Sequence, residues 1–147
     1  MLTGSIGGWR VNRRILSCLA LLLAGGCLNQ ADSQKMLAAE GHFFAEVRAK
    51  QFGQIYDESA PEFQAAATKD VFVGFMQRID RKLGDCQQPV KRMDWHANAT
   101  TSGYFMSQGF SSTCANGKLE QTLSMVMRNG TVKVLGYNAA SPLLLTD

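Results

Sequence analysis

The sequence is poor in the side chains and motifs that most often identify an enzyme or a metal protein. Its 147 residues include two histidines and four cysteines. It contains no GxSxG nucleophile motif, no glycine-rich phosphate loop and no zinc-type spacing of cysteines and histidines. We therefore expect neither a cofactor nor a bound metal. His42 has His96 as the only other histidine in the sequence, so we interpret His42 as a surface or boundary residue.

Little net charge remains once the N-terminal segment is set aside. The chain has 15 basic and 12 acidic residues, which gives a net charge of +3. Arg10, Arg13 and Arg14 are the only charged residues before Cys27. Removing residues 1–26 takes three from the basic residues and none from the acidic ones, so 12 of each remain. A neutral chain offers no basic surface, and we expect no nucleic-acid partner.

The N-terminus has the layout of an export signal. Residues 10–14 are basic, and residues 15–24 form a mostly apolar run. At about 1.5 Å per residue, this run covers about half of a bilayer core. It is therefore too short to span a membrane and is typical of a signal peptide.

The end of this run resembles the lipobox of bacterial lipoproteins. Residues 23–27 read Leu-Ala-Gly-Gly-Cys, in which small residues suit a tight protease site and the thiol can take a diacylglyceryl group. The resemblance implies cleavage before Cys27, acylation with chains such as palmitate, and attachment to a membrane. Leu28 stands where enteric-type bacteria use an aspartate to retain lipoproteins in the inner membrane, which favours the outer membrane, facing the periplasm. The alternative is an ordinary secretory signal, with Cys27 left as a thiol.

The two remaining cysteines are predicted to form a disulfide. Cys18 would leave with the signal peptide and Cys27 would carry the lipid, which leaves Cys86 and Cys114 in an oxidising compartment. If a hairpin turns near residue 100, both cysteines lie 14 residues from the turn, at the open end of the hairpin. The alternative is a pair of separately buried thiols.

The chain after the signal shows helical periodicity first and strand alternation afterwards. Apolar residues recur every three or four positions up to Leu83, and Gly84 is a natural stop for the last helix. After Cys86 the period becomes two, and Asn116-Gly117 and Asn129-Gly130 are strong hairpin signals. We expect an α+β fold, with N-terminal helices packed on a curled four-stranded antiparallel meander sheet. The expected helices cover residues 34–51, 54–59, 62–67 and 69–83, and the expected strands cover residues 89–97, 104–114, 119–128 and 132–137.

The same pattern predicts a simple domain organisation. Residues 1–26 are expected to be a lipoprotein signal peptide, and residues 27–33 a lipidated cysteine with a short polar tether. Residues 34–147 are expected to form a single domain, which is long enough to bury a core.

Four short segments carry a resemblance to a known family. They are Phe-Gly-Gln-Ile-Tyr at 52–56, Ser-Ala-Pro-Glu-Phe at 59–63, Thr-Lys-Asp-Val-Phe at 68–72 and Leu-Gly at 83–84, followed by strands divided by glycine turns. From about Leu37 to Pro142 the chain resembles nuclear transport factor 2-like, or cystatin-like, cone-fold domains, and among them small bacterial exported proteins of unknown function. The resemblance implies long helices lying across the concave face of the sheet.

This family resemblance does not determine an activity. Members include isomerases, dehydratases, transport adaptors and proteins of unknown role, so the fold cannot be converted into a reaction. Cone-fold domains often pair through their sheets, which makes a homodimer possible.

Four side chains are candidates for a cavity. Tyr56 and Asp57 match the residue types that cone-fold isomerases use, although no motif aligns them. Asp94 and His96 share one face of a predicted strand and could form a general acid/base pair.

We interpret these four residues as surface or packing residues rather than as catalytic ones. Met93 and Trp95 occupy the other face of the strand, which we expect to be the core, so Asp94 and His96 would face solvent. Tyr56 is expected to be a core aromatic residue with its hydroxyl capped. We therefore name no catalytic residue.

Two functions from different classes remain. The first is a lipid-anchored periplasmic module that binds a partner protein or a small apolar ligand inside the cone. The alternative is an enzyme of the isomerase or dehydratase type that carries out proton transfer in the cone cavity. The sequence favours the first, because it shows an anchor, a disulfide and no catalytic set.

Overall fold

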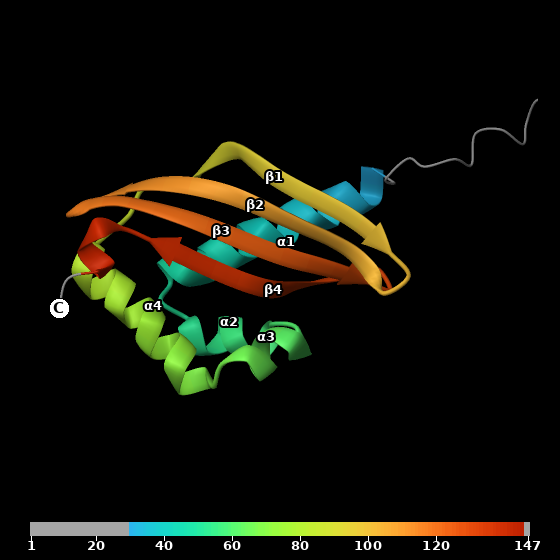
Figure 1. Cartoon of the computed structure of the whole chain (residues 1–147), viewed down its shortest axis with the longest axis horizontal. Helices are drawn as coiled ribbons and strands as arrows, with labels where there is room; N and C mark the ends of the chain where they lie inside the picture. The colour runs from blue at the N-terminus through green and yellow to red at the C-terminus, as the bar shows by residue number, and fades with distance from the viewer. Residues whose placement is uncertain (1–29, 146–147) are drawn as a thin grey trace, which may run out of the picture.

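The computed structural model describes residues 30–145, in which four helices precede a four-stranded antiparallel sheet (Figure 1). The predicted signal peptide and Cys27 lie outside the described residues. Within residues 30–145, no helix combines the length and the apolar character needed to cross a membrane. The elements are α1 (Gln30–Arg48), α2 (Phe52–Glu58), α3 (Pro61–Ala66), α4 (Lys69–Leu83), β1 (Val90–Thr100), β2 (Gly103–Cys114), β3 (Gly117–Arg128), β4 (Thr131–Ala140) and the short 3-10 helix η1 (Pro142–Leu144).

The first helix begins four residues earlier than the sequence pattern predicts. It starts at Gln30, so most of the segment predicted as a polar tether is helical. Asp32 lies in the first turn, where a negative charge suits the helix dipole, and it pairs with Lys35 at 3.5 Å. These local interactions extend the helix although the segment has no apolar stripe.

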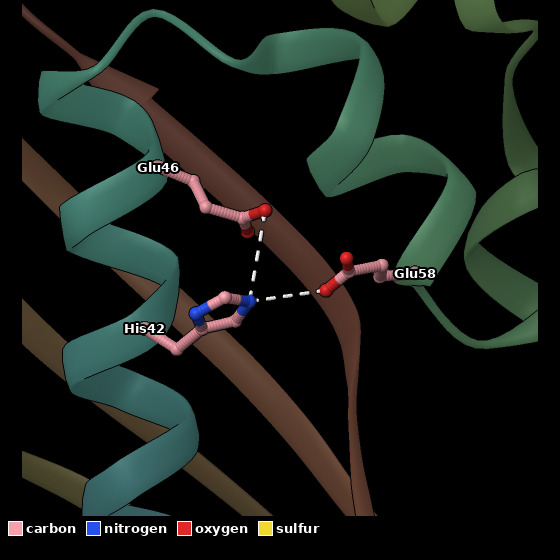
Figure 2. Close-up of side chains that lie close together, drawn as sticks. All are labelled: His42, Glu46 and Glu58. Carbon is pink, nitrogen blue, oxygen red and sulfur yellow. Dashed lines mark hydrogen bonds and ion pairs between the residues drawn. The ribbon is translucent and has the colours of Figure 1, made fainter.

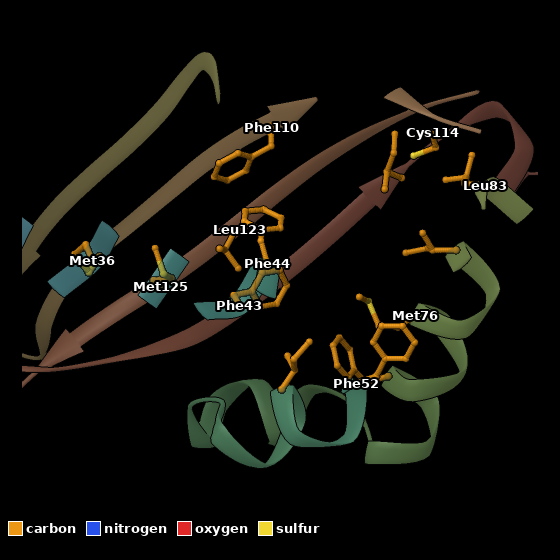
Figure 3. Packing of buried hydrophobic residues seen from close by; sticks show 14 residues of the cluster. Met36, Phe43, Phe44, Phe52, Met76, Leu83, Phe110, Cys114, Leu123 and Met125 are labelled. Atoms are coloured by element: carbon orange, nitrogen blue, oxygen red, sulfur yellow. The ribbon is translucent and has the colours of Figure 1, made fainter. Parts of the chain in front are cut away.

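Aromatic packing joins α1 to one face of the sheet. Phe43 and Phe44 are both buried. The ring centroid of Phe43 lies 5.2 Å from that of Tyr137, and the centroid of Phe44 lies 4.8 Å from that of Phe110. Figure 3 shows Phe43 and Phe44 beside Leu123 at the centre of the core. The packing of the helix on the sheet therefore depends on two adjacent aromatic residues.

The fourth helix forms where the sequence predicts it. The Thr68 hydroxyl accepts a hydrogen bond from the Val71 backbone N–H at 3.4 Å, which caps the N-terminus. The helix ends at Leu83, and Gly84 follows with a φ of +69°, a conformation that glycine adopts without a steric penalty. Its buried face consists of Phe72, Met76, Ile79 and Leu83.

The four strands follow one another across the sheet in chain order, β1-β2-β3-β4, as the predicted meander requires. Both predicted hairpins form, but they differ in where the turn lies. Asn129-Gly130 makes the turn between β3 and β4, whereas Ala115-Asn116 makes the turn between β2 and β3, and Gly117 is the first residue of β3. Cys114 pairs with Gly117 across one turn, and Arg128 pairs with Thr131 across the other. Asn129 and Gly130 both have positive φ angles, of 51° and 74°, which matches the hairpin turn that Asn-Gly favours.

The face of β1 that the alternation predicts to be core is exposed, so this prediction is wrong. Met93 is 97% exposed and Trp95 is 60% exposed. The register with β2 shifts between Lys91 and Trp95, so three residues stand opposite Gly109. β1 is an edge strand. The aromatic residues of α1 pack on β2 and β4, and α1 reaches β1 through the ion pair of Glu40 with Lys91 at 2.9 Å. Alternation identifies the two faces of a strand, but it does not show whether a helix covers either one.

A disulfide joins Cys86 to Cys114, as the sequence predicts. The Gln87 backbone N–H donates a hydrogen bond to the Thr113 carbonyl at 2.8 Å beside the bridge. The segment that follows α4 is thereby tied to the end of β2. This link holds the C-terminal end of α4 against the sheet.

Replacing both bridge residues, with Cys86→Ser and Cys114→Ser together, should lower the free energy of unfolding by about 3–4 kcal/mol, because the bridge closes a long loop in the unfolded chain. Urea unfolding followed by circular dichroism measures the change. A reductant should lower the unfolding midpoint of the wild-type protein to that of the double variant. It should leave the midpoint of the double variant unchanged. Equal unfolding midpoints for the double variant and the oxidised wild type would contradict the expected role.

Candidate functional site

A cavity of about 310 Å³ lies between the helices and the sheet, at the end of the molecule that holds the disulfide. It is bounded by the C-terminal half of α1, the start of α2, the second half of α4 and the inner faces of β2, β3 and β4. Most of its wall is apolar. Its apolar lining side chains include Phe44, Val47, Phe52, Met76, Ile79 and Leu119.

Three polar side chains of the sheet form the floor of this cavity. The Tyr137 hydroxyl donates a hydrogen bond to Gln121 Oε1 at 2.7 Å, and Gln121 Nε2 donates to Ser112 Oγ at 2.9 Å. Gln121 is 4% exposed and Ser112 is 3% exposed. Buried polar groups are costly unless they are hydrogen-bonded, so this chain of bonds stabilises the floor. Ser112 accepts its bond, so its own O–H can donate to a ligand.

The floor offers little acid or base chemistry at neutral pH. Tyr137 is its titratable group, and burial raises the pKa of this phenol above its ordinary value. A phenol with a raised pKa stays protonated and acts as a hydrogen-bond donor. The floor is therefore suited to orienting a ligand rather than to taking a proton from it.

Charged side chains of both signs surround the outer end of the cavity. Lys50 Nζ donates a hydrogen bond to Asp80 Oδ2 at 2.8 Å, and this bond raises the pKa of Lys50. Arg48 Nη1 donates to Gln88 Oε1 at 2.7 Å. Arg48 and Lys50 are exposed, as is Asp85 on the opposite wall. A ligand held here would place its apolar part inside and a polar part at this rim.

None of the four sequence candidates lines this cavity. The Tyr56 hydroxyl lies 3.0 Å from the Gln64 carbonyl oxygen and 2.9 Å from that of Ala67, within donating distance of both. This hydroxyl therefore caps the short helix α3, in keeping with the structural interpretation. Asp57 is exposed and accepts a hydrogen bond from Lys69 Nζ at 2.6 Å.

Asp94 and His96 lie on the exposed strand β1, apart from the other two candidates. The Arg92 guanidinium bonds to the Asp94 carboxylate and also to Glu120, and it holds the pKa of Asp94 below its usual value. A Cβ at Gly109 would collide with the Asp94 carboxylate, so a larger residue there would displace this carboxylate from its present position. The structure therefore shows Asp94 in a surface ion pair and does not unite the four candidates in one site.

The sequence pattern did contain one signal for the cavity. Gln121 lies on β3 between Leu119 and Leu123, on the face that packs against the helices. A polar residue at the centre of an apolar face must be satisfied by its neighbours. The partners Ser112 and Tyr137 come from two other strands, and only the folded structure shows that they meet.

No protein-family model matches this chain, and no curated protein matches it either. The functional interpretation therefore depends on the residues and geometry of the cavity.

Proposed function

We propose that this protein is a lipid-anchored module of the bacterial cell envelope that binds a small, mostly apolar ligand in the cavity between its helices and its sheet. The observation that carries the proposal is the cavity itself, with apolar walls, a hydrogen-bonding floor and a charged rim. Its volume of about 310 Å³ is near the lower end of the range for small-molecule sites, which is roughly 300–1,000 Å³.

The lining residues suggest which ligands would fit. An apolar body would pack between Phe44, Met76 and Leu119. A hydrogen-bonding group at its inner end would meet Ser112 and Gln121 on the floor. A ligand with charges along its whole length would be excluded, because burying an unpaired charge is costly.

The proposal includes the cone fold and the location in the periplasm. Helices lying on one face of an open antiparallel sheet are compatible with a nuclear transport factor 2-like domain. The lipobox-like segment ending at Cys27 supports an anchor, with the outer membrane favoured by Leu28. The Cys86–Cys114 bridge supports an oxidising compartment.

One observation favours a second function, the binding of a partner protein. Val90, Met93 and Trp95 are exposed on β1, which has an unpaired edge. Exposed apolar side chains on an edge strand can receive another strand, from a different protein or from a second copy in a homodimer. The proton-transfer enzyme has no comparable support, because the floor of the cavity carries Tyr137 rather than an acid/base pair with pKa values near neutrality.

Filling the cavity should weaken ligand binding. Val47 lines the cavity, so Val47→Phe should weaken binding of the apolar fluorescent probe N-phenyl-1-naphthylamine at least tenfold, or about 1.4 kcal/mol. Val71 is exposed on α4 and does not line the cavity, so Val71→Phe is the matched control and should bind as the wild type does. Titration of probe fluorescence measures binding, and thermal unfolding checks that both variants are folded. Equal binding by the two variants, or no binding by the wild type, would contradict the proposal.

The anchor has an equally direct test. Cys27→Ala should remove lipid labelling by palmitate and move the protein from the membrane fraction to the soluble envelope fraction, because the acylated thiol is lost. Cys18→Ala is the matched control within the predicted signal peptide and should change neither result. A Cys27→Ala protein that still sediments with membranes would show that something other than this cysteine attaches it.

A further inference from the structure

A second site lies outside the cavity, where α1 and α2 approach each other (Figure 2). His42 and Glu46 are one helical turn apart on α1, and Glu58 is the last residue of α2. His42 Nε2 lies 3.0 Å from Glu58 Oε2 and 3.6 Å from Glu46 Oε1. The three ligand-type atoms all lie within 4.8 Å of one another. Figure 2 shows one imidazole nitrogen facing both carboxylates.

The buried carboxylate of this cluster is incompletely satisfied. Glu46 is 4% exposed, and its Oε1, the atom that faces His42, has no hydrogen-bond partner. Nearly all buried polar atoms in folded proteins have a partner, so an exception calls for an explanation. Burial raises the pKa of Glu46, and the nearby His42 acts in the opposite direction. A cation placed between Glu46 and His42 would give the unpartnered oxygen a ligand contact.

We propose that His42, Glu46 and Glu58 bind one divalent transition-metal ion, of which Zn²⁺ is the best fit. Imidazole nitrogen and carboxylate oxygen are both normal ligands of zinc. Ca²⁺ and Mg²⁺ prefer oxygen ligands alone, and Mg²⁺ keeps several waters. The histidine therefore favours zinc over these two ions.

The distances agree with this assignment. Tetrahedral zinc with bonds of about 2.0–2.2 Å separates its ligand atoms by roughly 3.4 Å. The two distances from His42 Nε2 to the carboxylate oxygens, 3.0 Å and 3.6 Å, fall on either side of that value. Glu58 has a half-exposed side chain and can move to complete the geometry, while Gln54 Nε2 already donates to its other oxygen at 2.8 Å. Such an outer hydrogen bond is typical of carboxylates that hold a metal.

The bound ion would have a structural consequence. Three protein ligands leave a fourth position for water or an external group. The ion would join α1 to α2, and both helices contribute walls to the cavity through Val47 and Phe52. It would therefore stabilise those walls without entering the cavity. The inference goes beyond the proposed ligand binding, and neither depends on the other.

Calorimetric titration tests the proposal with the full protein as cells process it, purified in detergent and stripped with a chelator. We expect the wild type to bind one Zn²⁺ per chain in a saturable manner, and zinc to raise Tm by several degrees. His42→Ala and Glu46→Gln should each weaken zinc binding at least tenfold. His96→Ala removes the other histidine, which lies on β1, and should bind as the wild type does. Ca²⁺ and Mg²⁺ at the same concentration should leave Tm unchanged.

Several results would overturn the proposal. One is that the wild type shows no saturable zinc binding, and another is that Glu46→Gln binds zinc as the wild type does. A third is that His96→Ala loses as much zinc affinity as His42→Ala, and a fourth is that Mg²⁺ raises Tm as much as Zn²⁺ does. Glu46→Gln keeps the size and the hydrogen-bonding capacity of the side chain, so this variant should fold even if His42→Ala does not. Circular dichroism of each variant checks its fold. Failure of zinc binding would leave binding of the apolar probe intact, so the two proposals are distinguishable.

Discussion

The packing of two adjacent aromatic residues of α1 on the sheet is the constraint on which the rest of the structure depends. Phe43 meets Tyr137 and Phe44 meets Phe110, which fixes the helix over β2 and β4. Such ring pairs contribute about 0.5–1.5 kcal/mol each beyond the burial of their area. The large rings also hold the helix away from the strands. Beyond Phe44 the helix ends at Arg48, and the space that remains between it, α4 and the sheet is the cavity.

The disulfide and the polar floor bound the cavity on its other side. The bridge between Cys86 and Cys114 holds the end of α4 near the strand ends, so the cavity is bounded by a covalent link as well as by packing. Gln121 connects Tyr137 to Ser112 across three strands. A buried amide bonded at both its oxygen and its nitrogen favours one arrangement of the core, because any shift of a strand would break one of these bonds. The cavity is thus a feature that these contacts maintain.

Local signals predicted the parts of the fold that local interactions determine. The N-cap at Thr68 and the stop at Gly84 define α4, and Asn129-Gly130 forms the turn between β3 and β4. The pattern failed at Trp95, because an edge strand shows the same alternation as a covered one, and a register shift cannot be read from residue types. The candidate sites were harder to predict from the sequence than the fold was. Gln121 depends on partners from neighbouring strands, and Glu58 reaches His42 from another helix, 16 residues away. Such contacts arise from the tertiary fold, and no short sequence pattern predicts them.

The most direct test of the central claim is a crystal structure of the protein determined under xenon pressure. Xenon enters apolar cavities that are large enough to hold it, and it finds no site in a core that side chains fill. The cavity described above predicts xenon density among Phe44, Met76 and Leu119, next to the floor that Gln121 forms. A core in which side chains fill this space, with no xenon between α1, α4 and the sheet, would contradict the account.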